Sequence, residues 1–287
     1  MIARPLEYFE PHFLEEALVV LDRFDGRARA LAGGTRLVPE LRTGLGDVEA
    51  LVNLKRIAEL HAVTAENGTL SIGALTTAAG LCADAAVLKD APLLAYAAST
   101  LGSVQVRTLA TLGGNICCGD PASDLTTALL ALDATCCVAS LASGERRIAL
   151  EDLLVPGGAD LRAGEVLTRI LVPISRAVFA YRKMATRRGF EMALVAVAVA
   201  LERAGTRVER VRIALAGAGP TCLRAPRSER RALDALAGPS DLDAVAALAA
   251  DHDSAPQSDL RASALYRRQL IRVLTRRCLD DVRAVPS

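Results

Sequence analysis

The sequence predicts an α+β protein, in which a mixed first part precedes a small α+β C-terminal domain with an antiparallel sheet. Short β-like runs alternate with helical runs through the first half of the chain, as in mixed architectures. After a strand-like segment at 166–172 and Pro173, the order changes to an apolar run, a strand and three helices. Hydrophobic residues make up 52% of the 287 residues, so the chain can form packed hydrophobic cores and is not intrinsically disordered.

The elements of the first half follow from local spacing. Residues 12–24 place Leu14, Leu18 and Leu21 on one helical face. Residues 29–32 form a short strand that runs into a glycine pair, and further strands are predicted at 51–54 and 69–73. Residues 84–99 are predicted to form one helix, whose inner side carries Val87, Leu88, Leu94 and Ala95.

A domain boundary is predicted in the segment 175–178, which divides the chain into residues 1–177 and 178–287. Beyond it, Met192–Leu201 is apolar almost throughout, and residues 211–215 read as a strand. Helices are predicted to begin near Arg227, Asp241 and Arg261.

The charge balance excludes a general nucleic-acid binder. Lys and Arg number 34 against 33 Asp and Glu, whereas a protein that grips a phosphate backbone needs a basic excess. There is no Trp, and aromatic residues make up 3%, so few stacking platforms exist for single strands.

Neither a membrane span nor a secretory signal is predicted. The first seven residues lack the apolar run of a signal peptide. The longest apolar stretch, Met192–Leu201, is about half the length that a spanning helix needs. We therefore expect a cytoplasmic protein.

No metal site and no catalytic side chain is predicted. The seven cysteines include two adjacent pairs, but no C-x2-C ligand pair, so we interpret them as small buried hydrophobes. The three histidines are isolated from any carboxylate at ligand spacing.

Two glycine pairs are the candidate phosphate-binding motifs of the sequence. The first lies in residues 31–37, where a strand enters a tight turn that opens a helix, and the second lies in residues 111–115. Glycine lets a backbone approach a ligand closely, and a turn or helix N-terminus rich in N–H groups suits a pyrophosphate. No Lys or Arg lies between Thr111 and Asp124, so main-chain donors with Thr and Asn side chains would hold a phosphate there.

The residues alone leave a plain structural interpretation open. Glycine pairs commonly mark turns, and Asp120-Pro121 is typical of a helix start. Neither stretch matches the G-x-G-x-x-G or P-loop pattern. Gly217-Ala218-Gly219 lacks a third glycine and meets Pro220, which argues against a Rossmann site.

The order and spacing of several segments resemble the FAD-binding medium subunit of the xanthine dehydrogenase and carbon monoxide dehydrogenase family. The two loops lie about eighty residues apart, and the resemblance covers essentially the whole chain. The matching segments are Ala32-Gly33-Gly34-Thr35, Gln105-Val106-Arg107, Ala110-Thr111-Leu112-Gly113-Gly114-Asn115, Asp120-Pro121-Ala122-Ser123-Asp124, Lys183 with Arg187-Arg188, and residues 261–268.

This resemblance implies a two-part FAD-binding domain of the vanillyl-alcohol oxidase (PCMH) type in residues 1–177, followed by the family's C-terminal domain in residues 178–287. The two loops would grip the pyrophosphate and flank the flavin. Asp124 would accept a hydrogen bond from a ribose or ribityl hydroxyl, and Leu167 and Lys183 would pack near the adenine end. The implied cofactor-binding residues are Ala32, Gly33, Gly34, Thr35, Arg36, Leu37, Thr111, Gly113, Gly114, Asn115, Ser123, Asp124, Leu167 and Lys183.

The resemblance also implies partners. A large subunit with molybdenum–pterin would hydroxylate the substrate, and a small subunit with two 2Fe–2S clusters would relay electrons to the FAD of this chain. A dimer of heterotrimers is expected. The alternative is a self-sufficient FAD oxidoreductase that acts directly on a small substrate. The family's flavin-stacking aromatic falls near Phe190 or Glu191 and stays unassigned, and no insertion for a 4Fe–4S cluster is visible.

Overall fold

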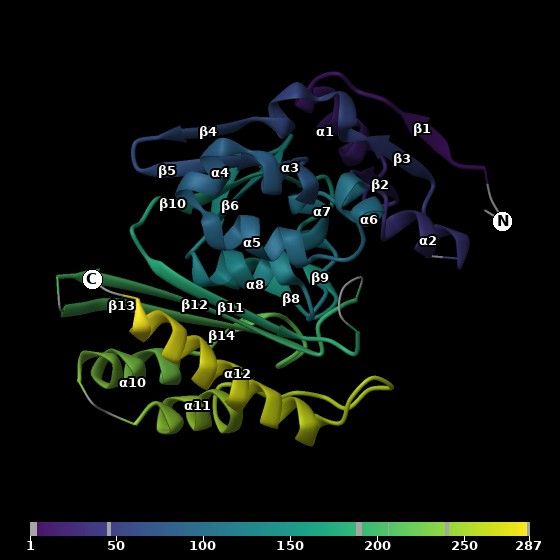
Figure 1. Ribbon diagram of the computed structural model, residues 1–287. Helices are drawn as coiled ribbons and strands as arrows, with labels where there is room; N and C mark the ends of the chain where they lie inside the picture. Colours follow the sequence, from purple (N-terminus) through teal and green to yellow (C-terminus); the bar gives the residue numbers. More distant parts are fainter. Residues whose placement is uncertain (1–4, 45–46, 188–190, 206, 239–240, 286–287) are drawn as a thin grey trace.

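The computed structural model describes residues 5–44, 47–187, 191–205, 207–238 and 241–285. Figure 1 shows two stacked parts, with the N-terminal elements above and the C-terminal sheet and helices below. The predicted α+β class is confirmed, because parallel, antiparallel and helical layers all occur. Among the helices in the described ranges, none is long and apolar enough to cross a membrane.

The chain begins with a small parallel sheet. Strands β1 (Glu7–Phe9), β3 (Ala50–Asn53) and β2 (Ala28–Leu31) lie in that order, and α1 (Leu14–Arg23) packs its apolar face against them. The helix and both strands predicted here are confirmed within a few residues. Helix α2 (Leu37–Arg42) follows the first glycine pair, and two short 3-10 turns, η1 (Leu54–Arg56) and η2 (Ala58–His61), follow β3.

A five-stranded antiparallel sheet forms the second unit. Its order is β4 (Val63–Glu66), β5 (Thr69–Gly73), β10 (Val166–Pro173), β6 (Thr135–Ser140) and β7 (Gly144–Ala149). Alternate strand residues such as Leu70 and Ile72 are fully buried against helices, as the two-residue period of a strand dictates. The other elements are α3 (Ala78–Ala83), α4 (Ala85–Asp90), α5 (Pro92–Thr100), α6 (Val104–Leu109), α7 (Leu112–Cys117), α8 (Asp124–Ala131), α9 (Leu150–Leu153), β8 (Leu154–Val155) and β9 (Gly158–Ala159).

The single helix predicted for residues 84–99 is wrong. Two helices occur, α4 and α5, with Ala91 between them in a non-helical conformation. Pro92 has no N–H to continue the first helix, but it fits the first position of the second.

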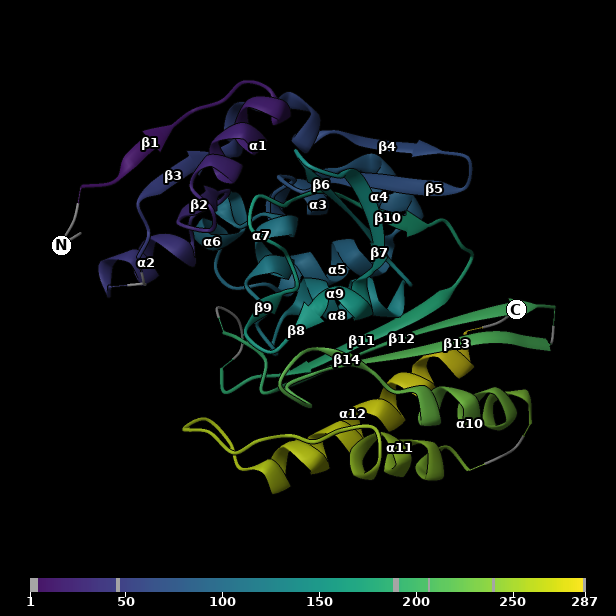
Figure 2. The ribbon, with the colours of Figure 1, turned by 180° about the vertical axis from the view of Figure 1, so that it is seen from behind.

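The C-terminal unit is an antiparallel sheet with helices on one face. Strands lie in the order β11 (Val178–Met184), β12 (Val195–Ala204), β13 (Arg207–Ala216) and β14 (Leu223–Arg224). Figure 2 shows α10 (Pro226–Ala237), α11 (Leu242–Asp251) and α12 (Ala264–Ala284) beneath this sheet. The three predicted helices are confirmed, although α12 begins three residues after Arg261, where Ser263 caps it.

Both faces of the C-terminal sheet are covered, which explains why residues 192–201 are apolar almost throughout. Residues 195–201 of β12 are all buried, because α12 packs on one face and α8 on the other. The connection from β10 to β11 spans residues 174–177, so the predicted boundary between 177 and 178 lies where β11 begins.

A carboxylate at the end of α8 joins the two parts. Asp133 Oδ1 lies 2.7 Å from Arg224 Nη1, and its Oδ2 lies 2.7 Å from Arg212 Nε. Both arginines belong to the C-terminal sheet. Asp133 has a left-handed backbone, with φ of 52°, a conformation that Asp tolerates better than most residues.

Replacing Asp133 with Asn should lower the free energy of unfolding by about 2 kcal/mol, because an amide N–H2 then faces two guanidinium donors. Thermal and denaturant unfolding of the purified chain measure this loss. Asp25→Asn is the matched control, since Asp25 is also left-handed (φ 43°) but has no side-chain partner among the described residues. An equal effect of both substitutions would contradict the role of the arginines.

Candidate functional site

The two predicted glycine loops lie side by side. We call residues 32–37 the first glycine loop and residues 111–115 the second. A methyl group added at Gly33 would overlap the carbonyl oxygen of Leu109, and one added at Gly114 would lie 3.9 Å from the Cβ of Ala32. The first loop follows strand β2, and the second loop follows helix α6. The fold thus places two loops from different units in contact.

The first glycine loop carries a row of unused backbone donors. Within the described ranges, the N–H groups of Gly33, Gly34, Thr35 and Arg36 have no hydrogen-bond acceptor. The side chains of Thr35 and Arg36 are exposed. Successive unpaired amides between a strand and a helix form a concavity that favours an anion. This loop therefore has four main-chain donors free to bind an anion such as a pyrophosphate.

One cation stands at this row of amides. Arg36 forms an ion pair with Glu40, and its Nη1 lies 4.0 Å from Asp120 Oδ2. The hydrogen bond to Glu40 is the main cause that raises the pKa of Arg36, so the guanidinium stays charged.

The second glycine loop differs from its prediction. Instead of offering bare amides, it forms the first turn of α7, where the Gly113 N–H donates to Ala74 O at 2.8 Å. The Gly114 N–H donates to the capping hydroxyl of Thr111 at 3.2 Å. The expectation of unpaired main-chain donors in both loops is therefore correct for the first loop only.

The second loop still presents a surface and a donor. Gly114 is exposed, whereas a methyl group at Gly113 would lie 2.7 Å from Ala74 Cβ, so Gly113 serves internal packing. Asn115 Oδ1 accepts a hydrogen bond from Ser123 Oγ at 2.5 Å. This bond leaves the Asn115 side-chain N–H2 without an acceptor among the described residues.

Ser123 and Asp124 begin α8, close to the second loop. Ser123 Oγ accepts from the Thr126 N–H and caps the helix, which corrects the interpretation of Asp120-Pro121 as the helix start. Asp124 is 4% exposed, and its carboxylate accepts from Tyr181 Oη at 2.5 Å and from Lys183 Nζ at 2.7 Å. Burial is the main cause that raises the pKa of Asp124, while Lys183 opposes it.

Leu167 and Lys183 occupy different surroundings. Leu167 is buried in the core of the five-stranded sheet, opposite Val138 of β6. Lys183 lies on β11, donates to Thr100 O at 3.1 Å, and lines a cavity of about 590 Å³. The other residues that line this cavity are Tyr96, Ser99, Thr100, Gly102, Arg107, Tyr181, Met184, Ala185, Thr186, Arg187 and Glu191.

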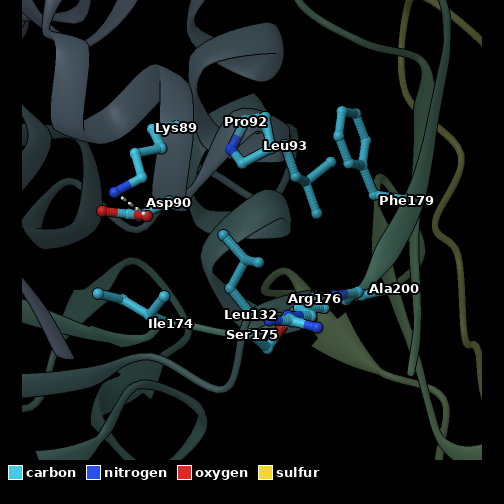
Figure 3. Close-up of a pocket in the computed structure, with 11 residues that line it drawn as sticks. Lys89, Asp90, Pro92, Leu93, Leu132, Ile174, Ser175, Arg176, Phe179 and Ala200 are labelled. Atoms are coloured by element: carbon cyan, nitrogen blue, oxygen red, sulfur yellow. Dashed lines mark hydrogen bonds and ion pairs between the residues drawn. The ribbon is translucent and has the colours of Figure 1, made fainter. Parts of the chain in front are cut away.

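A second cavity lies away from these residues. Figure 3 shows it between the α4–α5 break and the connection into β11. Its volume is about 520 Å³. Its apolar wall includes Leu93, Leu132 and Phe179, and Lys89 Nζ lies 4.0 Å from Asp90 Oδ1. None of the residues predicted to bind a cofactor lines this cavity.

Sequence reasoning missed Tyr181. This residue and Lys183 share one face of β11, because side chains two residues apart on a strand point the same way. Once Lys183 is a candidate, that spacing marks Tyr181 as its neighbour. The predictions near Arg188 and Phe190 fall outside the described residues.

All seven cysteines are free thiols. Four of them are buried, as the sequence predicts, whereas Cys82, Cys117 and Cys118 are partly buried. Burial raises the pKa of the Cys117 thiol beside the second loop to about 12, which makes it a poor nucleophile. Among the described residues, no group of three or more His, Cys, Asp and Glu side chains is placed to hold a metal.

Comparison with protein families agrees with this geometry over both parts of the chain. Residues 4–175 match the FAD-binding domain in molybdopterin dehydrogenase. Residues 179–282 match the CO dehydrogenase flavoprotein C-terminal domain.

Relatives match over nearly their full length. The chain is 33% identical to the glyceraldehyde dehydrogenase medium chain of Sulfolobus acidocaldarius, covering 96% of this chain and 97% of that one. It is 31% identical to the carbon monoxide dehydrogenase medium chain of Hydrogenophaga pseudoflava, covering 98% of each. The xanthine dehydrogenase FAD-binding subunit of Escherichia coli O157:H7 is 30% identical, with 89% of this chain and 88% of that one covered.

Solved structures share the fold. A chain of reconstituted CO dehydrogenase from Oligotropha carboxidovorans superposes with a TM-score of 0.91 at 30% identity, and 99% of each chain is covered. A chain of quinoline 2-oxidoreductase from Pseudomonas putida 86 gives a TM-score of 0.89 at 31% identity, covering 99% of this chain and 98% of that one. The protein therefore belongs to the molybdenum hydroxylase family, as a medium, FAD-binding subunit of an oxidoreductase.

Proposed function

We propose that FAD lies across the two glycine loops, with its pyrophosphate on the first. The observation that carries this proposal is the row of unpaired N–H groups from Gly33 to Arg36 beside the exposed backbone of Gly114. The guanidinium of Arg36 adds positive charge at the same place. Backbone donors and one cation suit the two negative phosphate groups of a dinucleotide.

Other predicted residues shape this site. Ala32 and Leu37 flank the amide row, and the hydroxyl of Thr35 is exposed beside it. On the second loop, Thr111 caps α7 and Asn115 offers its side-chain N–H2. The two loops thus divide the work, since one supplies main-chain donors and the other an exposed glycine and an amide side chain.

We propose that one of the two ring systems of FAD enters the cavity of about 590 Å³ that Lys183 lines. Ser123 and Asp124 connect this cavity to the second loop, because Ser123 binds Asn115 and Asp124 binds Lys183. Asp124 would accept a hydrogen bond from a hydroxyl of FAD. Leu167 would serve the site through the packing of the sheet behind it.

The two regions that match family models are assigned different roles in cofactor binding. We propose that residues 1–177 form the FAD-binding domain and that residues 178–287 form a C-terminal domain that completes the site. No catalytic acid or base is required of either domain, because the cofactor carries the redox chemistry and the protein binds and orients it.

We propose that the chain works in the cytoplasm as one of three kinds of subunit, in a dimer of heterotrimers. The relatives are medium chains or subunits of dehydrogenases, and one relative with a solved structure is a chain of a Cu,Mo-CO dehydrogenase. The FAD would accept electrons from the 2Fe–2S clusters of a small subunit and pass them to an external acceptor. A large subunit with molybdenum–pterin would oxidise the substrate.

Gly114→Val should reduce the FAD content of the purified chain at least tenfold, because its side chain would occupy the exposed surface between the two loops and its Cβ would lie 2.8 Å from Thr111 Oγ1, which caps α7. The ratio of flavin absorbance to protein concentration measures this content. Gly80→Val is the matched control, since Gly80 also donates its N–H to a capping threonine, Thr77, in α3. A folded Gly114→Val chain with normal FAD content would refute the proposed loop.

The isolated chain loaded with FAD should not bleach when it is mixed with a substrate of the intact complex, whereas the complex should bleach rapidly. Stopped-flow absorbance of the flavin distinguishes the two. Chemical reduction of the isolated chain by dithionite is the control for an accessible flavin. Bleaching of the isolated chain by substrate would instead establish a self-sufficient FAD oxidoreductase.

A further inference from the structure

The C-terminal domain holds the segment that precedes α8. The Gly217 N–H, at the end of β13, donates to Pro121 O at 2.7 Å. The thiol of Cys222 lies 3.4 Å from the same carbonyl oxygen and 3.5 Å from Thr127 Oγ1. These contacts hold residues 121–127, which form the approach to α8 and its first turn.

The strongest of these interdomain contacts involves the first residue of α8. Tyr181 Oη donates to Asp124 Oδ1 at 2.5 Å, and Lys183 Nζ donates to Oδ2 at 2.7 Å. Tyr181 and Asp124 are 8% and 4% exposed. The ring of Tyr181 also packs edge-on against Tyr96, with 5.9 Å between ring centroids.

Each of the two donors has its own task. A buried carboxylate needs a compensating charge, and Lys183 supplies it. The phenol of Tyr181 satisfies the second oxygen, so both oxygens of Asp124 are fixed in place. Burial, with Asp124 as the next cause, raises the pKa of Tyr181 well above its ordinary value, so the phenol stays a donor at any physiological pH.

The position of Asp124 is transmitted to the second glycine loop through its neighbour. Ser123 precedes Asp124, caps α8, and donates to Asn115 Oδ1 at 2.5 Å. Asn115 directly follows Gly114. A shift of Asp124 would therefore move Ser123 and Asn115. Asn115 lies next to Gly114, on whose exposed surface the FAD is proposed to lie.

We propose that Tyr181, a residue of the C-terminal domain, is a positioning residue of the FAD site that fixes Asp124 and, through Ser123 and Asn115, the second glycine loop. This inference rests on the proposed FAD site. It assigns to the C-terminal domain a share in cofactor binding that Lys183 alone would not provide, because Lys183 binds only one of the two carboxylate oxygens.

The test compares the FAD dissociation constant of the full chain with that of Tyr181→Phe, which keeps the ring and removes only the hydroxyl. We expect binding about tenfold weaker, since a hydrogen bond to a charged acceptor is lost, together with a shift in the absorbance bands of the bound flavin. Tyr266→Phe is the matched control, because the exposed Tyr266 hydroxyl on α12 has no partner among the described residues.

A double-mutant cycle tests the route of action. In an Asp124→Ala background, Tyr181→Phe should cause no further loss of FAD affinity, because its acceptor is already gone. Unchanged affinity and spectrum in Tyr181→Phe, with or without a lower melting temperature, would overturn the inference and leave the FAD site intact. A full loss that persists in the Asp124→Ala background would also overturn it. Failure of the unmodified chain to bind FAD would instead reject the proposed function.

Discussion

The burial of α8 on every side is the constraint on which the arrangement of this molecule depends. All eight of its residues are buried, because α5, α7, β12 and β13 all pack against it. Such a helix cannot be amphipathic, and its sequence is apolar except at its first turn. The polar exception at its start, Asp124, then requires buried donors, and the C-terminal domain provides them.

Glycine has two separate functions in the pair of loops. Gly33 and Gly113 are required because the protein's own backbone or a neighbouring alanine lies where a side chain would go. These close approaches hold the two loops together through contacts within the protein itself. Gly114 faces outward, and the first loop keeps its N–H groups unpaired. Internal packing therefore requires glycine at 33 and 113, while the backbone of Gly33, Gly34 and Gly114 remains available to a cofactor.

Local patterns in the sequence predicted elements such as α1, β2, β3 and the three C-terminal helices, because helix faces, strand periods and turn residues are short-range features. They failed where the deciding contact is distant. The Gly113 N–H is consumed by Ala74, and Asp124 is bound by Tyr181, 57 residues later. Pro92 did mark the break between α4 and α5, but the apolar spacing on both sides concealed it. The order of the motifs identified the family, although their spacing could not predict the hydrogen-bond partners of residues such as Gly113 and Asp124.

Three structural units converge on the proposed cofactor site. The parallel sheet supplies the first loop, the turn between α6 and α7 in the second unit supplies the second loop, and β11 supplies Tyr181 and Lys183. A ligand that contacts all three binds only when they are docked, so its binding energy adds to the stability of the docked state. Conversely, any weakening of the junction at α8 lowers the fraction of molecules competent to bind. In the proposed site, cofactor retention and domain docking are therefore coupled, and Asp124 contributes to both through its contacts with Tyr181 and Lys183.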